Sequence, residues 1–142
     1  MDTVKPGQIA PSFRLPDAEG REISLSQYKQ FHPLVLLLWS GADGSWLEDF
    51  AAHFSDYQSA GANLLAIGPG HPSTTGLPFR ALQDPDGQAT RRLAETLPAV
   101  LVLDQFGEVF RRWQGREAQT PDHADIRSWV DFTQVQCEEC GI

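Results

Sequence analysis

The chain has 142 residues, about the size of one ordinary domain, and its content of 41% hydrophobic and 21% charged residues is usual for a globular protein. Its formal net charge of −8 and its pI near 4.8 argue against non-specific binding to nucleic acid and against docking on anionic lipid. The longest apolar run, residues 34–39, is too short to span a bilayer, and no secretory signal pattern is recognisable. Two cysteines are too few for a disulfide-stapled scaffold, so we expect a cytoplasmic protein that binds neither nucleic acid nor membranes.

The first part of the chain shows the pattern of a β-hairpin over residues 7–28. Apolar and polar residues alternate on both sides of a turn-forming sequence, Asp-Ala-Glu-Gly, at residues 17–20. Residues 34–39 are then continuously apolar between Pro33 and Gly41, which is typical of a strand buried on both faces of a sheet. The sequence therefore predicts a hairpin followed by a central strand.

Helices and strands alternate in the middle of the chain. Residues 45–59 have helical spacing, with aromatic side chains on one face and acidic or amide side chains on the other. Residues 63–68 predict a second buried strand, and the glycine, proline, serine and threonine of residues 69–78 predict a loop. A further helix is expected over residues 86–95.

The last third of the chain begins with a third buried strand at residues 99–103. A tight turn joins it to an antiparallel partner at residues 108–113. A last helix is expected to start with Thr120 as its N-cap and Pro121 at its first position. This order of elements predicts an α/β sandwich in one domain over residues 1–142, with a mixed central sheet flanked by helices.

Four segments, in register over about a hundred residues, carry a family pattern. They are Gly-Gln-Ile-Ala-Pro-Ser-Phe-Arg-Leu at residues 7–15, the apolar strand at 34–39, Gln-Asp-Pro-Asp-Gly at 83–87, and Leu-Pro-Ala-Val-Leu-Val-Leu-Asp at 97–104. Together they resemble the AhpC/TSA or redoxin family, the peroxiredoxins and membrane-tethered thiol reductases of the thioredoxin fold. The resemblance implies a thioredoxin-like sandwich with an N-terminal β-hairpin, and an antioxidant or thiol-disulfide oxidoreductase function.

The resemblance implies an active-site cysteine, but this chain has none at the expected position. The family carries a thiolate in the first turn of the helix after the first buried strand, where the helix N-terminus lowers the thiol pKa. In this chain no residue from Asp43 to Leu47 is a cysteine. The vestigial active-site loop consists of Asp43, Gly44, Ser45 and Trp46. We expect Asp43 or Ser45 to cap the helix and Trp46 to pack beneath the hairpin, with a ligand over the helix N-terminus as the alternative.

Pro98 stands where the family places an arginine that holds the peroxide. It resembles the cis-proline that faces the active site in thioredoxins, so the resemblance implies a cis peptide bond before Pro98. A trans proline that starts the strand is the alternative. The four histidines, at positions 32, 53, 71 and 123, are scattered and show no spacing that suggests a catalytic triad with Ser45.

Cys137 and Cys140 are the only cysteines and form a Cys-X-X-Cys motif. Such a pair can cycle between dithiol and disulfide, since an i,i+3 spacing can bring two Cα atoms within about 7 Å. It can also supply half of a metal site that another chain completes, or consist of two incidental thiols. The flanking Glu138 and Glu139 are expected to raise the thiol pKa and slow the reactions of the thiols.

Two functions are therefore compatible with the sequence. In the first, the protein is an oxidoreductase whose redox pair is Cys137 and Cys140, working with a thiol reductant or a protein partner. In the second, it is a catalytically inactive binding or assembly module, in which these cysteines link the subunits of a homodimer or hold a metal between them. The sequence predicts no cofactor, and it predicts no metal site within the chain itself.

Overall fold

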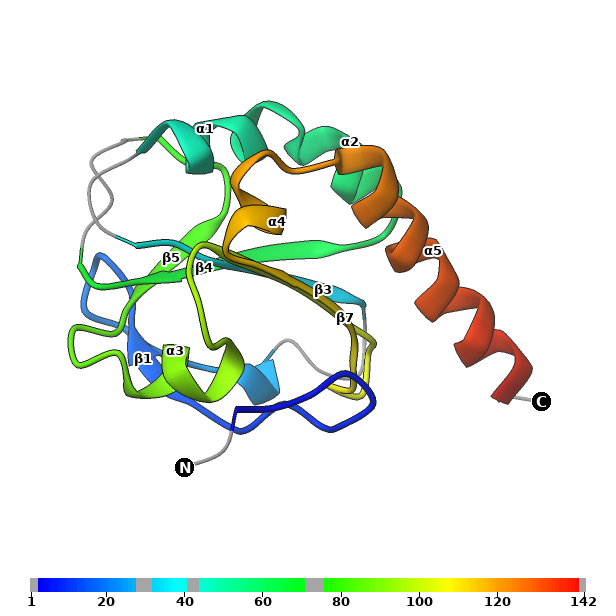
Figure 1. The fold of residues 1–142 in the computed structure, drawn as a ribbon, viewed down its shortest axis with the longest axis horizontal. Helices are drawn as coiled ribbons and strands as arrows, with labels where there is room; N and C mark the ends of the chain where they lie inside the picture. Colours follow the sequence, from blue (N-terminus) through cyan, green and yellow to red (C-terminus); the bar gives the residue numbers. More distant parts are fainter. Residues whose placement is uncertain (1–2, 28–31, 41–43, 71–75, 141–142) are drawn as a thin grey trace.

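A computed structural model describes residues 3–27, 32–40, 44–70 and 76–140 (Figure 1). Five strands form a mixed sheet in the order β5-β4-β3-β6-β7. Their bounds are β3 Leu34–Leu38, β4 Asn63–Gly68, β5 Arg80–Gln83, β6 Ala99–Leu103 and β7 Val109–Gln114. The central strand β3 pairs in parallel with β4 and antiparallel with β6, and β6 and β7 form an antiparallel hairpin. The predicted mixed sheet and its final hairpin are confirmed.

Strand β3 is apolar at every position because both faces of the sheet are covered. Leu34, Leu36 and Leu38 belong to one hydrophobic core, and Val35 and Leu37 belong to a second core on the opposite face. Successive side chains of a strand point to opposite faces, so one short run supplies both cores. This double burial is what the continuous apolar run in the sequence predicted.

The N-terminal β-hairpin and a short helix cover the first face, in the lower part of Figure 1. Strand β1 (Arg14–Pro16) pairs antiparallel with β2 (Glu22–Ser24), and a 3₁₀ turn, η1 (Leu25–Gln27), follows. Helix α3 spans Gln88–Leu93. The core on this face joins them through the buried side chains Phe13, Ile23, Leu25 and Leu93. The predicted N-terminal hairpin is thereby confirmed.

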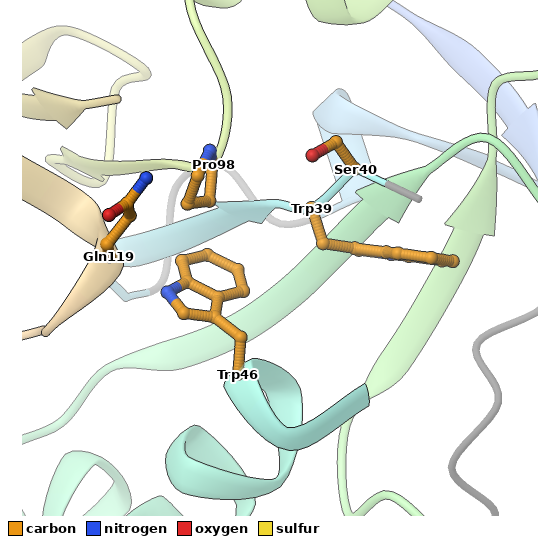
Figure 2. Close-up of a pocket in the computed structure, with 5 residues that line it drawn as sticks. All are labelled: Trp39, Ser40, Trp46, Pro98 and Gln119. Carbon is orange, nitrogen blue, oxygen red and sulfur yellow. The ribbon is translucent and has the colours of Figure 1, made fainter. Parts of the chain in front are cut away.

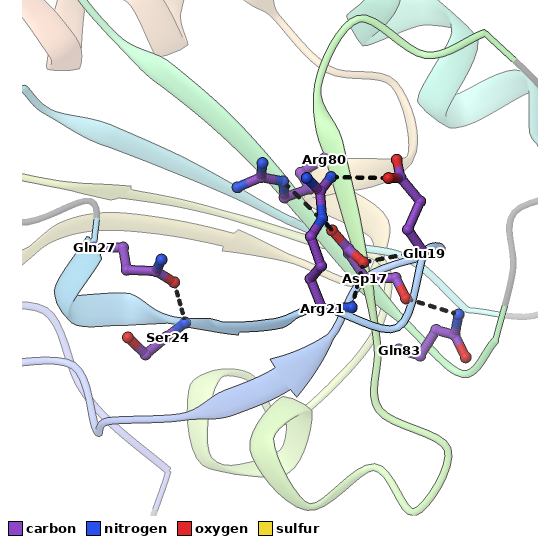
Figure 3. A network of polar contacts seen from close by, with 7 residues as sticks. All are labelled: Asp17, Glu19, Arg21, Ser24, Gln27, Arg80 and Gln83. Atoms are coloured by element: carbon purple, nitrogen blue, oxygen red, sulfur yellow. Dashed lines mark hydrogen bonds and ion pairs between the residues drawn. The ribbon is translucent and has the colours of Figure 1, made fainter.

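Asp17, in the turn of the hairpin, fastens this hairpin to the edge of the sheet (Figure 3). Its Oδ1 accepts hydrogen bonds from the backbone N–H groups of Glu19 and Arg21, each at 2.9 Å, and its Oδ2 accepts one from Arg21 Nε at 3.2 Å. Nε of Arg80, in strand β5, lies 3.7 Å from Oδ2 of the same carboxylate. Burial raises the pKa of Asp17, but the backbone hydrogen bonds from Arg21 and Glu19 and the Arg21 guanidinium outweigh it and hold the pKa below its ordinary value.

Four helices cover the second face; in Figure 1, α1 and α2 lie at the top and α5 runs down the right side. They are α1 Gly44–Ala52, α2 Phe54–Ser59, α4 Arg116–Gln119 and α5 His123–Cys140. The core on this face contains Leu47 and Phe50 of α1, Tyr57 of α2, and Ile126 and Val130 of α5. In the described parts of the chain, no helix is long and apolar enough to cross a membrane.

The helix predicted over residues 45–59 is two helices, so that prediction was wrong in its continuity. The break lies at His53, whose N–H bonds to the carbonyl of Phe50, three residues back, instead of the usual four. His53 itself has φ −100° and ψ 7°, outside the helical region. The tighter turn changes the direction of the chain and separates α1 from α2.

The last helix begins at His123, not after an N-cap at Thr120 as predicted. Thr120 and Pro121 connect it to α4, which the sequence analysis did not predict. The cap comes from Asp122, whose Oδ1 accepts the N–H of Asp125 at 3.1 Å. Aspartate is an equally good N-cap, and its position two residues after Thr120 moves the start of the helix.

Strand β5 was not predicted, and helix α3 is shorter than the helix predicted over residues 86–95. Strand β5 adds to the sheet in parallel with β4, although only Leu82 of its four residues is fully buried. Helix α3 starts at Gln88. Asp84, which precedes the helix, accepts hydrogen bonds from the backbone N–H and the hydroxyl of Thr90 in its first turn, at 2.8 and 2.9 Å. A short edge strand with one buried side chain carries too little periodicity to be recognised.

Candidate functional site

A cavity of about 300 Å³ lies where the end of β3 meets the start of β6 (Figure 2). The antiparallel register pairs Leu38 with Ala99, so the residues after β3 and the residue before β6 come together. Five residues line the cavity: Trp39, Ser40, Trp46, Pro98 and Gln119. They come from the end of β3, the start of α1, the start of β6 and the end of α4.

Trp46 is fixed in the wall of this cavity. Its indole Nε1 donates a hydrogen bond of 2.7 Å to the backbone carbonyl of Ala118 in α4, and its ring meets Phe50 edge-on with 5.1 Å between ring centroids. Trp46 therefore packs against α4 on the second face and not beneath the N-terminal hairpin, which lies on the first face and is where we had predicted it. The reason is that α1 crosses the sheet on the face opposite the hairpin.

Trp39 forms another part of the wall and is only 5% exposed. Its ring lies against Gly68 at the end of β4, so closely that a larger residue there would have to displace the ring. Among the residues that the structure describes, Trp39 Nε1 is the only buried side-chain nitrogen or oxygen without a hydrogen-bond partner. A buried polar group in that state is costly.

Pro98 faces the cavity, and the peptide bond between Leu97 and Pro98 is cis, the isomer that the family resemblance implied. The carbonyl of Pro98 accepts a hydrogen bond of 2.9 Å from the N–H of Gly115. The structure therefore brings two of the residues singled out in the sequence, Trp46 and Pro98, into one cavity.

None of the five described residues that line the cavity carries a thiol, a carboxylate, an imidazole or an amine. Acid–base catalysis needs a group that changes its protonation state, and nucleophilic catalysis by a hydroxyl needs an adjacent base. The lining offers aromatic surface, one hydroxyl and one amide. Such a set can bind a neutral group.

Of the other residues of the predicted loop, Ser45 is not among the residues that line the cavity. Asp43 lies outside the described residues, so its predicted role as a cap stays a prediction. Gly44 begins α1, and Ser45 follows it on the exposed surface.

Cys137 and Cys140 lie on the last turns of α5. In Figure 1 this end of the helix projects from the body of the protein, far from the start of α1. The structure therefore does not bring the two cysteines to the cavity. Whether they form a redox pair stays a prediction.

The four histidines are not all scattered, contrary to the sequence analysis. The rings of His53 and His123 stack at 3.9 Å between centroids, with an angle of 17° between their planes. Asp49 of α1 lies beside both of them, 4.0 Å from His53 and 2.9 Å from His123. The four-residue spacing of Asp49 and His53 was a usable sign of one helix face, but nothing in the sequence ties His123 to it.

Three residues of the cavity were not singled out from the sequence: Trp39, Ser40 and Gln119. Trp39 and Ser40 follow the central strand directly, so a search for polar or aromatic residues at strand ends would have found them. Gln119 gave no such sign because it ends a helix of four residues that was not predicted.

Comparisons with known proteins agree with this fold. A protein of Mycobacterium tuberculosis named as a peroxiredoxin is 33% identical over 93 residues, which cover 58% of this chain and 59% of that protein. The chloroplastic peroxiredoxin Q of Populus jackii is 32% identical over 126 residues, covering 75% of this chain and 58% of the relative. This chain thus matches less than two thirds of the length of these relatives.

Solved structures give the same fold at lower sequence identity. The mitochondrial 2-Cys peroxiredoxin of Plasmodium falciparum has a TM-score of 0.76 at 14% identity, over 97% of this chain and 98% of the other. Peroxiredoxin Q of Xanthomonas campestris has a TM-score of 0.72 at 17% identity, over 84% and 90%. The model of the AhpC/TSA family matches residues 6–123. This chain, with its thioredoxin-like mixed sheet and its cavity at the end of β3, belongs to the AhpC/TSA family.

Proposed function

We propose that this chain is a binding module of the AhpC/TSA family, whose cavity at the end of β3 receives an apolar side chain of a protein partner. One observation carries the proposal: among the residues that the structure describes, those that line the cavity at the start of α1, where the family resemblance implies a thiolate, carry no thiol, carboxylate, imidazole or amine, and Trp39, Trp46 and Pro98 supply its apolar surface. The nearby residues 41–43 are Gly-Ala-Asp, so no cysteine stands next to the cavity in sequence either.

The size and lining of the cavity support one apolar side chain as the ligand. A volume of about 300 Å³ is at the lower end of the range for ligand sites. The cavity is therefore large enough for one apolar side chain but not for a large cofactor. Indole rings supply a large rigid contact area and dominate the energetics of many protein interfaces. The amide of Gln119 and the hydroxyl of Ser40 can hydrogen-bond to the neutral peptide backbone next to the bound side chain.

Nuclear magnetic resonance of the ¹⁵N-labelled protein tests this proposal. N-acetyl-leucinamide and N-acetyl-phenylalaninamide serve as probes, and N-acetyl-glycinamide is the control without a side chain. We expect the two apolar probes, at millimolar concentration, to shift the indole N–H signals of Trp39 and Trp46 but not that of Trp129 on α5. Equal shifts with the glycine control, or no shift with any probe, would contradict a site for an apolar side chain.

An activity measurement complements the binding test. With dithiothreitol and hydrogen peroxide, we expect no peroxide consumption by the Cys137→Ser/Cys140→Ser variant above that of a protein-free control. Consumption that survives both substitutions would show that another group of the chain reduces peroxide, and the binding-module proposal would then fall.

A second function, thiol–disulfide exchange at Cys137 and Cys140, has one observation in its favour. Both residues lie on the continuous helix α5. Positions i and i+3 of a helix have Cα atoms about 5 Å apart, within the range that a disulfide spans. A thiol reductant would recycle the pair, and the small number of cysteines supports a reducing compartment such as the cytoplasm.

Mass spectrometry after alkylation separates the two functions. For a redox pair, both thiols are alkylated in dithiothreitol and both are protected after mild oxidation. The Cys137→Ser variant then leaves Cys140 alkylatable, or forms intermolecular crosslinks if the protein is a homodimer. Full alkylation of both thiols under oxidant would exclude thiol–disulfide exchange and leave the binding module.

A further inference from the structure

Two histidines and an aspartate meet on the outer side of the second face, away from the cavity. His53 lies between α1 and α2, His123 is the first residue of α5, and Asp49 belongs to α1. Nε2 of His123 is 2.9 Å from Asp49 Oδ2, and Nε2 of His53 is 4.0 Å from Asp49 Oδ1. One potential ligand atom from each residue lies within 4.8 Å of the other two. The same nitrogen of both rings therefore faces one carboxylate.

The opposite nitrogen of each ring is held by its own partner. Nδ1 of His123 lies 2.7 Å from the hydroxyl of Tyr57, which is fully buried, and Nδ1 of His53 lies 3.5 Å from Oδ2 of Asp56. Histidines that bind metals through Nε2 typically donate their Nδ1–H to a carboxylate or another acceptor, which fixes the ring and its tautomer. Asp56 can accept that proton from His53, and the Tyr57 hydroxyl oxygen can accept it from His123.

We propose that Asp49, His53 and His123 bind a divalent first-row transition metal ion, Zn²⁺ foremost, through one carboxylate oxygen and the two Nε2 atoms. Imidazole and carboxylate together suit zinc and its neighbours in the series better than calcium or magnesium, which prefer oxygen ligands alone. Three protein ligands leave the fourth position of a tetrahedral site to water or to a ligand in solution.

The distances are compatible with such a site. Ligand atoms about 2.1 Å from a tetrahedral ion lie roughly 3.4 Å from one another. Here Nε2 of His123 is 2.9 Å from Oδ2 of Asp49 and Nε2 of His53 is 4.0 Å from Oδ1, and one ligand atom of each residue lies within 4.8 Å of the other two, so a small movement of the side chains brings them to ligand spacing. His123 is the fixed ligand, since its side chain is 9% exposed and also packs edge-on against Phe50 at 4.8 Å. The side chains of His53 and Asp49 are 39% and 44% exposed, so both can adjust and the ion can enter from solvent.

The site would join two parts of the chain that are far apart in sequence. His53 marks the break between α1 and α2, and His123 starts α5 seventy residues later (123 − 53 = 70). A bound ion would hold the α1–α2 junction against the first turn of α5. Without an ion, Nε2–H of His123 donates to Asp49 and the Tyr57 hydroxyl donates to Nδ1, so the site can also exist empty.

Zinc titration of a variant that lacks the cysteines tests the proposal. The protein is untagged, carries Cys137→Ser and Cys140→Ser, and is stripped with a chelator that is then removed. We expect isothermal titration with ZnCl₂ to give one equivalent per chain. His53→Ala and Asp49→Asn, each made in this background, should lower the affinity about tenfold or more. His32→Ala, at an exposed histidine outside the cluster, is the matched control and should bind as the parent does.

Two further measurements keep the result unambiguous. Circular dichroism checks that each variant is folded, and the visible absorption of bound Co²⁺ reports whether its ligands are the tetrahedral set expected here. No uptake by the cysteine-free parent would overturn the proposal, as would equal affinities of the parent, His53→Ala and Asp49→Asn. Zinc that binds only when Cys137 and Cys140 are present would place the metal at those cysteines and equally overturn it.

Discussion

The indole ring of Trp39 lies on Gly68, so closely that a Cβ atom added at position 68 would come within 2.0 Å of the ring. The two residues stand at the ends of the neighbouring parallel strands β3 and β4, and the N–H of Trp39 bonds to the carbonyl of Ile67 at 3.1 Å. Gly68 does not have a positive φ, so its backbone conformation suits any residue. It is the close approach of the ring that requires glycine here, and the contact sets one wall of the cavity.

Substitution of Gly68 by alanine should therefore destabilise the protein by about 1–3 kcal/mol, the usual cost of overpacking a core. The new methyl group has to push Trp39 towards the cavity, so binding of N-acetyl-leucinamide should weaken as well. Urea unfolding measures the first effect and the indole signals the second. Gly70→Ala is the control, because nothing lies within 4 Å of a Cβ at that position. Equal stability of the two variants would show that Trp39 moves away at no cost.

Trp46→Phe removes the hydrogen bond to Ala118 and some of the volume that fills the second core. A buried carbonyl that loses this donor, together with a partly emptied site, predicts a loss of about 2 kcal/mol in the free energy of unfolding. Trp129→Phe on α5, at a partly buried tryptophan, controls for the change of ring. If both variants lose the same stability in urea, the hydrogen bond between α1 and α4 contributes little.

Asp17→Asn should lower the free energy of unfolding at neutral pH. It should also make that free energy less dependent on pH in the acidic range. Because the folded pKa of Asp17 lies below its unfolded value of about 3.9, its contribution is complete above that pH and is lost as the pH falls through the folded pKa. The difference in unfolding free energy between wild type and variant should thus shrink below pH 4. Asp86→Asn, at an exposed aspartate, should show no such trend. A difference that stays constant down to pH 2 would mean that the charge of Asp17 is not what anchors the hairpin.

Tyr57→Phe should lower stability by about 1 kcal/mol at pH 8, because the buried hydroxyl no longer bonds to His123 Nδ1. Burial raises the pKa of Tyr57 well above its ordinary value of about 10, opposed by Arg127 and aided by Asp49. The folded pKa is raised, so the stability of the wild type is complete below pH 10 and falls as the pH rises above it. Phenylalanine has no proton to lose, so the two proteins should converge in urea unfolding at about pH 11. If both proteins lose stability equally as the pH rises, groups other than Tyr57 cause the loss of stability at alkaline pH.

The sequence predicted the three strands of the sheet that are buried on both faces and missed strand β5, which is not. Residues 34–39, 64–67 and 99–103 are continuous apolar runs, and they lie in or next to β3, β4 and β6. Such runs can be recognised without tertiary information, because an unbroken series of apolar residues by itself indicates a strand that is buried on both faces. Strand β5 has one fully buried side chain and exists because β4 offers it an edge. Its presence depends on a pairing that no local pattern shows.

The cavity could be predicted only in part, for the same reason. Trp46 and Pro98 were found because the family resemblance marks their places. Gln119 reaches the cavity through a four-residue helix that follows the β6–β7 hairpin. The stacking of His53 on His123 likewise depends on how α5 crosses α2, which periodicity along one helix does not encode.

The position of β3 at the centre of the sheet bears on how the chain folds during its synthesis. Strands β3, β4 and β5 leave the ribosome first and can form a three-stranded parallel sheet, but β6 and β7 follow later. Until residues 99–103 arrive, the five apolar residues of β3 form an open sheet edge, the kind of edge that pairs with other chains. A nascent chain stalled before residue 99 should therefore aggregate or recruit chaperones, whereas one that has released β6 and β7 should not.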